Sequence, residues 1–114
     1  MSGISTHILD TATGRPAVGV GVSLARLRDG SDCDVLAQAT TDADGRCRQL
    51  LPDAQQLAPG IYRIRFETGA YYDSRRTEGL YPFVEITFTV RTGDEHVHIP
   101  LLVSANGYTT YRGN

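Results

Sequence analysis

Two histidines in the C-terminal segment, His96 and His98, are the residues whose type and spacing most clearly suggest chemistry. They stand two positions apart in an alternating apolar segment, so a β-strand would place both rings on the same face. An imidazole with an ordinary pKa of about 6.5 can accept or donate a proton at neutral pH. A tail containing Tyr111 and Arg112 follows, where terminal residues are more often polar and loose. We therefore predict a functional site near this end of the chain.

A third histidine, His7, lies on an alternating segment near the other end of the chain. The first and last strands of β-sandwiches are often neighbours, so His7 could approach His96 and His98. One histidine on a strand is more often structural than catalytic, but three such residues near the chain ends favour a site. The same three side chains could instead hold a zinc ion. We favour a site without a metal, because the His-x-His spacing is common by chance and no acidic ligand is clearly placed beside it.

Arg46 follows the turn residues Asp44 and Gly45 and has two interpretations. It is either a solvated turn cation or a fixed guanidinium that binds a planar oxyanion or carboxamide through two hydrogen bonds. Nucleophilic catalysis has little support, since no Gly-x-Ser-x-Gly motif occurs and Cys47 is expected to be inert packing. Phosphate-binding glycine loops are absent from the sequence as well. If the protein is an enzyme, these residue types favour a histidine as general base on water, with an arginine stabilising negative charge.

The elements that would position these residues indicate an all-β fold. Alternation and turn signals predict strands at residues 4–10, 18–27, 35–41, 61–68, 82–90, 95–104 and 108–112. In the fourth of these strands, Tyr62, Ile64 and Phe66 form the expected core face. A short helical turn is expected at 51–57, and a loop or short helix at 69–81. Short strands at this frequency predict a β-sandwich of immunoglobulin-like proportions, without the Cys-Trp-Cys pattern of a true immunoglobulin domain.

Composition narrows the function class further. A chain of 114 residues is expected to form one domain, 1–114. Its formal net charge of -2, with both signs interspersed, argues against a general nucleic-acid binder. The apolar runs are too short to span a membrane and no secretory signal is recognised, so a cytoplasmic location is the default expectation. Cys33 and Cys47 match no zinc or redox motif, and reduced thiols are favoured over a disulfide.

Four segments carry a resemblance to a known family. They are Thr6–Asp10 with Gly14–Ala17, then Thr41–Arg46, His96–Ser104 and Tyr108–Asn114. Together and in this order they resemble the 5-hydroxyisourate hydrolase family, the transthyretin-related enzymes of purine catabolism. The Tyr-Arg-Gly of the last segment separates these enzymes from the hormone-binding transthyretins.

The resemblance implies a fold, an assembly and an activity. The fold would be a transthyretin-like (prealbumin-like) β-sandwich of two antiparallel sheets with one short helix. The assembly would be a homotetramer, built as a dimer of dimers. The activity would be hydrolysis of the small molecule 5-hydroxyisourate to 2-oxo-4-hydroxy-4-carboxy-5-ureidoimidazoline, without a metal or an organic cofactor.

The resemblance also implies roles for individual residues. The positions that match the family's catalytic residues are His7, Arg46 and His98. The positions expected to contact substrate are His96, Tyr111, Arg112 and Asn114. Which of the two catalytic histidines is the general base is left open.

One departure from the family and one alternative function remain to be weighed. The family usually has a serine where this chain has Asn114; an amide donates and accepts hydrogen bonds at separate atoms, so it could bind substrate but would be a poor proton relay. The alternative is a transthyretin-type binding module whose central channel takes an apolar or phenolic ligand. His7, His98 and the Tyr-Arg-Gly tail would narrow and polarise that channel, which favours the hydrolase.

Overall fold

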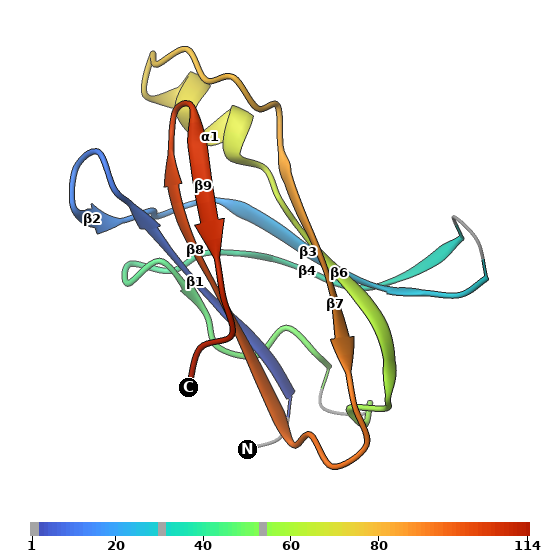
Figure 1. The fold of residues 1–114 in the computed structure, drawn as a ribbon. Coiled ribbons are helices and arrows are strands. Elements are labelled where there is room, and N and C mark those ends of the chain that lie inside the picture. The colour runs from blue at the N-terminus through green and yellow to red at the C-terminus, as the bar shows by residue number, and fades with distance from the viewer. Residues whose placement is uncertain (1–2, 30–31, 53–54) are drawn as a thin grey trace.

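Two β-sheets packed face to face make up the protein, as the computed structural model shows (Figure 1). The structure describes residues 3–29, 32–52 and 55–114. The first sheet contains β1 (Gly3–Asp10), β2 (Arg15–Pro16), β5 (Arg46–Cys47), β8 (His96–Ser104) and β9 (Gly107–Thr110). The second contains β3 (Gly21–Leu27), β4 (Cys33–Thr40), β6 (Gly60–Phe66) and β7 (Val84–Val90). The strand orders are β2-β1-β8-β9, with β5 also pairing with β1, and β4-β3-β6-β7.

The predicted β-sandwich with one short helix is confirmed, but one strand pairing differs from the expectation. β1 pairs with β8 in parallel along its whole length, from Gly3 beside His96 to Asp10 beside Val103. The expectation of two purely antiparallel sheets is therefore wrong for this pair. Between these strands the chain crosses to the second sheet twice; on its first return it forms β5, which runs antiparallel to β1, and on its second it forms β8, which runs parallel to β1.

The alternating burial of residues along the strands shows which side chains face the interior. Tyr62, Ile64 and Phe66 on β6 are buried as predicted. Ile4 and Ile8 on β1 are both fully buried, and they meet the apolar side chains of the second sheet in a common core. Because side chains alternate along a strand, Ser5 and His7, which alternate with Ile4, Thr6 and Ile8, point to the outer face of the first sheet.

Several boundaries differ from the sequence prediction. The second predicted strand begins at Gly21 rather than residue 18, because Val18 is exposed and Gly19 has a φ of 80°, which belongs to a turn. The short strands β2 and β5 lie outside all of the predicted strands. The helical turn expected at 51–57 includes residues 53 and 54, which lie outside the described residues, and the described residues around them are not helical.

The helix α1 (Thr68–Ser74) begins just before the segment for which a loop or short helix was expected. It packs against the end of β1, where the Tyr71 hydroxyl donates a 2.9 Å hydrogen bond to Oδ2 of the buried Asp10 carboxylate. The Asp10 Oδ1 atom accepts a further hydrogen bond from the backbone N–H of Ala12. The buried carboxylate therefore has hydrogen-bond partners on both oxygens and joins α1 to β1. Within the described residues, no helix has the length and apolar character needed to cross a membrane.

Candidate active site

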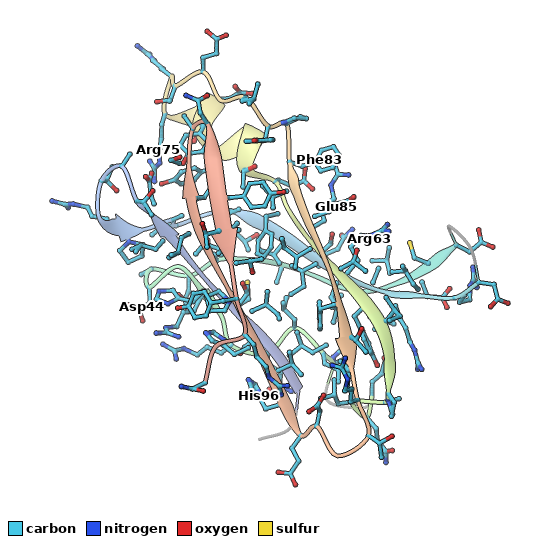
Figure 2. The ribbon with its side chains drawn as sticks, viewed as in Figure 1. Asp44, Arg63, Arg75, Phe83, Glu85 and His96 are labelled. Atoms are coloured by element: carbon cyan, nitrogen blue, oxygen red, sulfur yellow. The ribbon has the colours of Figure 1, made fainter. Side chains whose placement is uncertain are left out.

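A hollow of about 200 Å³ lies on the outer face of the first sheet, and it gathers most of the chemistry-bearing residues. We call it the histidine hollow. Its lining residues are Ser5, Thr6, Arg46, Arg48, His96, His98 and Asn114. Figure 1 shows the C-terminal tail returning past the first half of β8 toward the start of β1, and Figure 2 labels His96 in this region. Residues from both ends of the sequence therefore meet in one place.

Strand register places these side chains on a common face. In the parallel pair, Ser5 lies beside His98 and Gly3 lies beside His96. In the antiparallel pair of β1 with β5, His7 lies opposite Arg46. Directly paired residues and residues two apart share a face. The sequence prediction that His7 could approach the two C-terminal histidines is thus supported by the pairing of their strands.

Ser5 lies at the centre of this cluster, and sequence reasoning missed it. Its Oγ atom is 2.8 Å from His96 Nε2 and 2.7 Å from His98 Nδ1. The side chain is almost fully buried, with 7% of its surface exposed. Serine alone gives no chemical signal in a sequence. The signal that could have found it is its position two residues before His7, on the same strand face.

A glycine turn holds Arg46 in place. Gly45 has a φ of 75°, and a Cβ there would lie 2.6 Å from the carbonyl oxygen of Ile8, so only glycine fits. The Gly45 carbonyl accepts a hydrogen bond from the Ile8 N–H, and Asp42 Oδ1 accepts one from the Arg46 N–H. Backbone N–H groups of Arg46 and Asp44 hold the pKa of the Asp42 carboxyl below its usual value. These bonds fix the β5 backbone opposite β1.

The two arginines of the histidine hollow have different partners. Arg48 Nη2 donates to Asp44 Oδ2 at 3.2 Å, so its charge is paired. Among the described residues, the Arg46 guanidinium has no carboxylate within ion-pair distance and no side-chain hydrogen bond. Arg46 is only partly exposed, so its charge is held at the hollow. The interpretation of Arg46 as an oxyanion-binding cation is therefore favoured over that of a solvated turn residue.

The surroundings of His98 keep its imidazole neutral. Burial is the largest effect that lowers the pKa of His98 below its ordinary value of 6.5, followed by the nearby charges of Arg46, His7 and His96. A hydrogen bond with the Ser5 backbone acts in the opposite direction. Removal from water and neighbouring positive charge both disfavour the imidazolium ion. At neutral pH His98 is therefore uncharged, with a proton on only one of its two ring nitrogens.

The tail covers His98 through Gly113. The Gly113 N–H donates a 2.8 Å hydrogen bond to the His98 carbonyl. A Cβ at Gly113 would lie 2.5 Å from His98 Cδ2 and 3.0 Å from Pro100 Cγ. The glycine of the Tyr-Arg-Gly segment thus allows the tail to lie directly against the imidazole. The next residue, Asn114, then lines the histidine hollow.

Tyr111 and Arg112 directly precede Gly113 in the tail, but they do not line the histidine hollow. They line a second hollow of about 230 Å³ between β7 and β8, together with Phe88 and Ile99. Arg112 Nη2 lies 3.3 Å from Asp94 Oδ1 at the turn that precedes β8. The structure of one chain therefore brings His7, Arg46, His96, His98 and Asn114 together, whereas it places Tyr111 and Arg112 at a neighbouring hollow.

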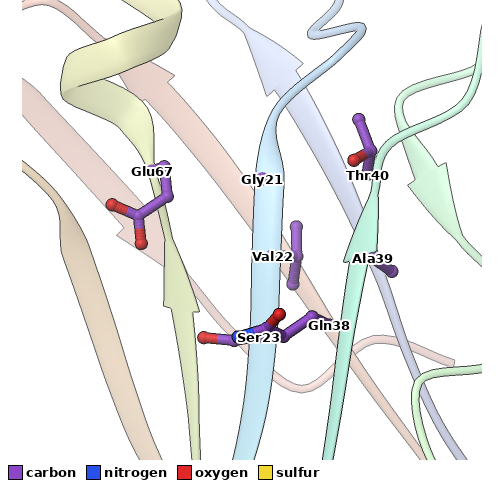
Figure 3. Close-up of a pocket in the computed structure, with 7 residues that line it drawn as sticks. All are labelled: Gly21, Val22, Ser23, Gln38, Ala39, Thr40 and Glu67. Atoms are coloured by element: carbon purple, nitrogen blue, oxygen red, sulfur yellow. The ribbon is translucent and has the colours of Figure 1, made fainter.

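Other parts of the described chain offer less chemistry. A hollow of about 350 Å³ beside β3 and β4 is lined by Ser23, Gln38 and Glu67, among others, and Glu67 is paired with Arg65 (Figure 3). No three His, Cys, Asp or Glu side chains in the described ranges form a group that could hold a metal ion. Cys33 and Cys47 are both free thiols. Burial raises the pKa of Cys47 to about 11, so it is a poor nucleophile, as expected.

Comparisons with known proteins agree on one family. The family model described as HIUase/Transthyretin matches residues 4–113. The 5-hydroxyisourate hydrolase of Caulobacter vibrioides is 47% identical over 121 residues, covering 100% of both chains. The structure of Klebsiella pneumoniae 5-hydroxyisourate hydrolase has a TM-score of 0.86 and 40% identity, with full coverage of both chains. Sea bream transthyretin in complex with thyroxine has a TM-score of 0.89 and 28% identity, covering 96% of this chain and 93% of that one.

Replacing Arg46 tests the electrostatic control of His98. Arg46→Gln should raise the pKa of His98, because removing a nearby positive charge makes the imidazolium ion less unfavourable. A histidine titration followed by NMR measures the change. Arg48→Gln is the matched control, because Arg48 is paired with Asp44 and should shift the titration less. Equal shifts in the two variants would contradict the role of Arg46.

Replacing Gly113 tests the packing of the tail on the imidazole. Gly113→Ala should displace the tail, because the new methyl group would overlap the His98 ring. The pKa of His98 should then rise toward 6.5 as the ring becomes more exposed, and the same NMR titration measures it. Gly107→Ala is the control, since a Cβ there would meet only Ser104 Oγ, at 3.7 Å. A Gly113→Ala variant with an unchanged titration would show that the tail does not bury His98.

Proposed function

The chain belongs to the HIUase/Transthyretin family, and on that premise we propose that it hydrolyses 5-hydroxyisourate to 2-oxo-4-hydroxy-4-carboxy-5-ureidoimidazoline. The name 5-hydroxyisourate hydrolase is carried by relatives that match the chain over its full length. It is thus a hydrolase of purine catabolism. The site of the reaction is the histidine hollow.

One observation carries the assignment of the site. A neutral, partly buried histidine, His98, and an arginine without a carboxylate partner, Arg46, share one open hollow. The substrate is a planar heterocycle that readily forms an anion. A guanidinium can pair with its oxygen atoms through two hydrogen bonds, while a neutral imidazole accepts a proton from water. The hollow therefore supplies both groups that ring-opening hydrolysis requires.

The reaction that we propose begins with a water molecule beside a ring carbonyl of the substrate. A catalytic histidine takes one proton from the water, and the resulting hydroxide adds to the carbonyl carbon. The ring C–N bond then breaks, and the proton returns to the leaving nitrogen. Arg46 stabilises the negative charge that forms on oxygen. On His98 the reacting atom is Nε2, because Nδ1 is engaged by Ser5. His7, opposite Arg46, is the other candidate for the base.

We propose substrate-binding roles for His96 and Asn114, which line the hollow. Tyr111 and Arg112 would reach substrate only in an assembly, since in one chain they line the hollow between β7 and β8. The Asn114 amide can hold substrate by donating and accepting at separate atoms. It does not relay a proton through one atom as a serine hydroxyl does, so proton transfer is assigned to the histidines.

We propose that the reaction needs neither a metal nor an organic cofactor, because imidazole, guanidinium and water account for each step. Activity should then survive a chelator such as EDTA.

We also propose a cytoplasmic location, supported by the free thiols of Cys33 and Cys47, since paired cysteines are typical of oxidising compartments.

A binding module remains the second candidate, because the fold equally resembles a transthyretin that is bound to thyroxine. The fold alone does not separate the two functions. The residues of the histidine hollow favour hydrolysis, since ionisable side chains dominate its lining. A pocket for an apolar ligand is lined mainly by hydrophobic and aromatic side chains.

We further propose a homotetramer, built as a dimer of dimers. Both sheets end at strands without a further partner in the described chain, β7 in one sheet and β9 in the other. An edge strand with free backbone groups can pair with another chain. Tyr108 on β9 is exposed and stacks edge-on against Tyr81, so an aromatic surface lies at that edge.

The hydrolase proposal predicts faster loss of 5-hydroxyisourate than in buffer alone. The substrate is made from urate with urate oxidase, and its near-ultraviolet absorbance is followed. His98→Asn should lower kcat by a factor of about 100 to 10,000, the usual contribution of general acid–base catalysis. Because the pKa of His98 is lowered below 6.5, the wild-type rate should be kept as the pH falls to 6.5. It should drop only at lower pH, where His98 becomes protonated.

Ser23→Ala is the control for this assay, since Ser23 lies on β3 beside a different hollow. It should retain the wild-type rate. A folded wild-type protein that leaves the spontaneous decay unchanged would instead favour the binding module, and a fully active His98→Asn variant would remove His98 from the catalytic site.

The assembly proposal predicts a molar mass in solution of four times the 12.4 kDa of one chain. Light scattering coupled to size-exclusion chromatography measures this mass directly. Pairing through the β7 and β9 edges should keep the mass constant over a tenfold dilution. A mass of one chain at micromolar concentration would contradict the tetramer.

A further inference from the structure

The proposed mechanism gives Ser5 no role, although its hydroxyl lies between two histidine rings. The Oγ atom is within hydrogen-bond distance of His96 Nε2 and of His98 Nδ1. A hydroxyl has one proton, so it can donate to only one of these nitrogens and must accept from the other. The protonation of the two rings is therefore coupled through Ser5.

This coupling allows two proton arrangements when both rings are neutral. In the first, Ser5 donates to His96 Nε2 and accepts from His98 Nδ1, which leaves a lone pair on His98 Nε2. In the second, Ser5 donates to His98 Nδ1 and accepts from His96 Nε2, which leaves a proton on His98 Nε2. The first arrangement makes His98 a base toward the hollow, and the second makes it a proton donor.

Nothing in the described residues fixes one arrangement. The tautomer of a functional histidine is usually set by the partner of its other nitrogen, often a carboxylate or a backbone carbonyl. His96 Nδ1 is buried and has no hydrogen-bond partner among the described residues. It is an unpaired N–H in the first arrangement and an unpaired lone pair in the second. Both arrangements leave a buried polar atom unsatisfied, so neither is locked.

We propose that Ser5 is a positioning residue that relays a proton between His98 and His96, so that His98 Nε2 serves first as base and then as acid. The relay rests on the hydrolase function proposed above. His98 Nε2 takes a proton from water, the proton on His98 Nδ1 passes to Ser5 Oγ, and the Ser5 proton passes to His96 Nε2. His98 ends neutral with a proton on Nε2, and His96 ends as the imidazolium ion. The reverse transfers restore the starting state once His98 Nε2 has protonated the leaving nitrogen.

The charges around the relay give it a direction. The groups that face His98 are Arg46 on β5, His7 on β1 and His96 on its own strand, and Arg48 also lines the hollow. In the strand register Arg46 lies opposite His7, whereas His96 lies beside Gly3, four residues back along β1. Passing the proton to His96 therefore moves positive charge away from Arg46. Like charges repel less at the larger distance, so the relay lowers the cost of taking the proton from water.

Ser5→Ala and Ser5→Thr test the relay through steady-state kinetics. Ser5→Ala should lower kcat by about 10- to 100-fold, the loss typical of removing the hydrogen-bond partner that orients a metal-binding histidine, with little change in KM. Ser5→Thr keeps the hydroxyl and should retain most of kcat. Ser23→Ala, which removes a hydroxyl from a strand of the other sheet, is the matched control and should not change either constant.

A double-mutant cycle separates relay from substrate binding. If Ser5 acts through His96, then Ser5→Ala, His96→Phe and the double variant should share about the same loss of kcat, because members of one chain are not additive. Additive losses, or a His96→Phe variant altered only in KM, would overturn the relay. So would a Ser5→Ala variant that keeps both kcat and the pH profile of the wild type.

Nitrogen NMR of the histidine rings tests the relay independently of the hydrolase proposal. Protonated and unprotonated ring nitrogens have well-separated 15N shifts. In the wild type, His96 Nε2 and His98 Nδ1 should both show intermediate shifts from exchange between the two arrangements, and Ser5→Ala should abolish this averaging. Shifts fixed in one state and unaffected by Ser5→Ala would overturn the relay. A wild-type protein without hydrolase activity but with averaged shifts would refute the proposed function while leaving the proton coupling intact.

Discussion

The parallel pairing of β1 with β8 is the constraint on which the site depends. It brings residues some 90 positions apart into contact, so that one serine hydroxyl reaches two histidine rings. The register of this pair is set from the other face of the sheet, where Ile4 and Ile8 are fully buried. A slip of one residue would exchange the faces and expose both side chains, at a cost of about 1.5–3 kcal/mol for each. The hydrophobic core thus fixes the geometry of the polar site behind it.

The second constraint is the turn that carries Arg46. Asp42 Oδ1 accepts hydrogen bonds from the backbone N–H groups of Asp44 and Arg46, and Oδ2 lies 3.9 Å from Arg48 Nε, so this carboxylate pairs with Arg48 and not with the Arg46 guanidinium. Exposed ion pairs contribute only about 0–1 kcal/mol to stability, so leaving this arginine without a partner costs the fold little. Arg46 can therefore keep its charge for an anionic ligand and, at the same time, disfavour the protonated form of His98.

Sequence patterns predicted the strands better than they predicted the neighbours of each strand. The alternation of Tyr62, Ile64 and Phe66 identified a core face directly, because side-chain period depends only on the strand itself. The parallel partner of β1 could not be predicted in this way, since periodicity says which face is buried but not which strand lies alongside. Ser5 escaped notice for the same reason: its importance comes from two rings on a distant strand. The short strand β5 was missed because a two-residue strand leaves no periodic signal.

The histidine hollow combines two requirements that oppose each other. Burial under the tail and the charge of Arg46 keep His98 unprotonated, so its basic form is available at neutral pH. The same effects weaken it as a base, because a lower pKa means a smaller driving force for taking a proton from water. A relay through Ser5 resolves this opposition, since the imidazole can accept a proton on one nitrogen while releasing another away from Arg46. The spacing of His96 and His98 suits such a relay, since two rings on the same strand face, two residues apart, are both within reach of one hydroxyl on the adjacent strand.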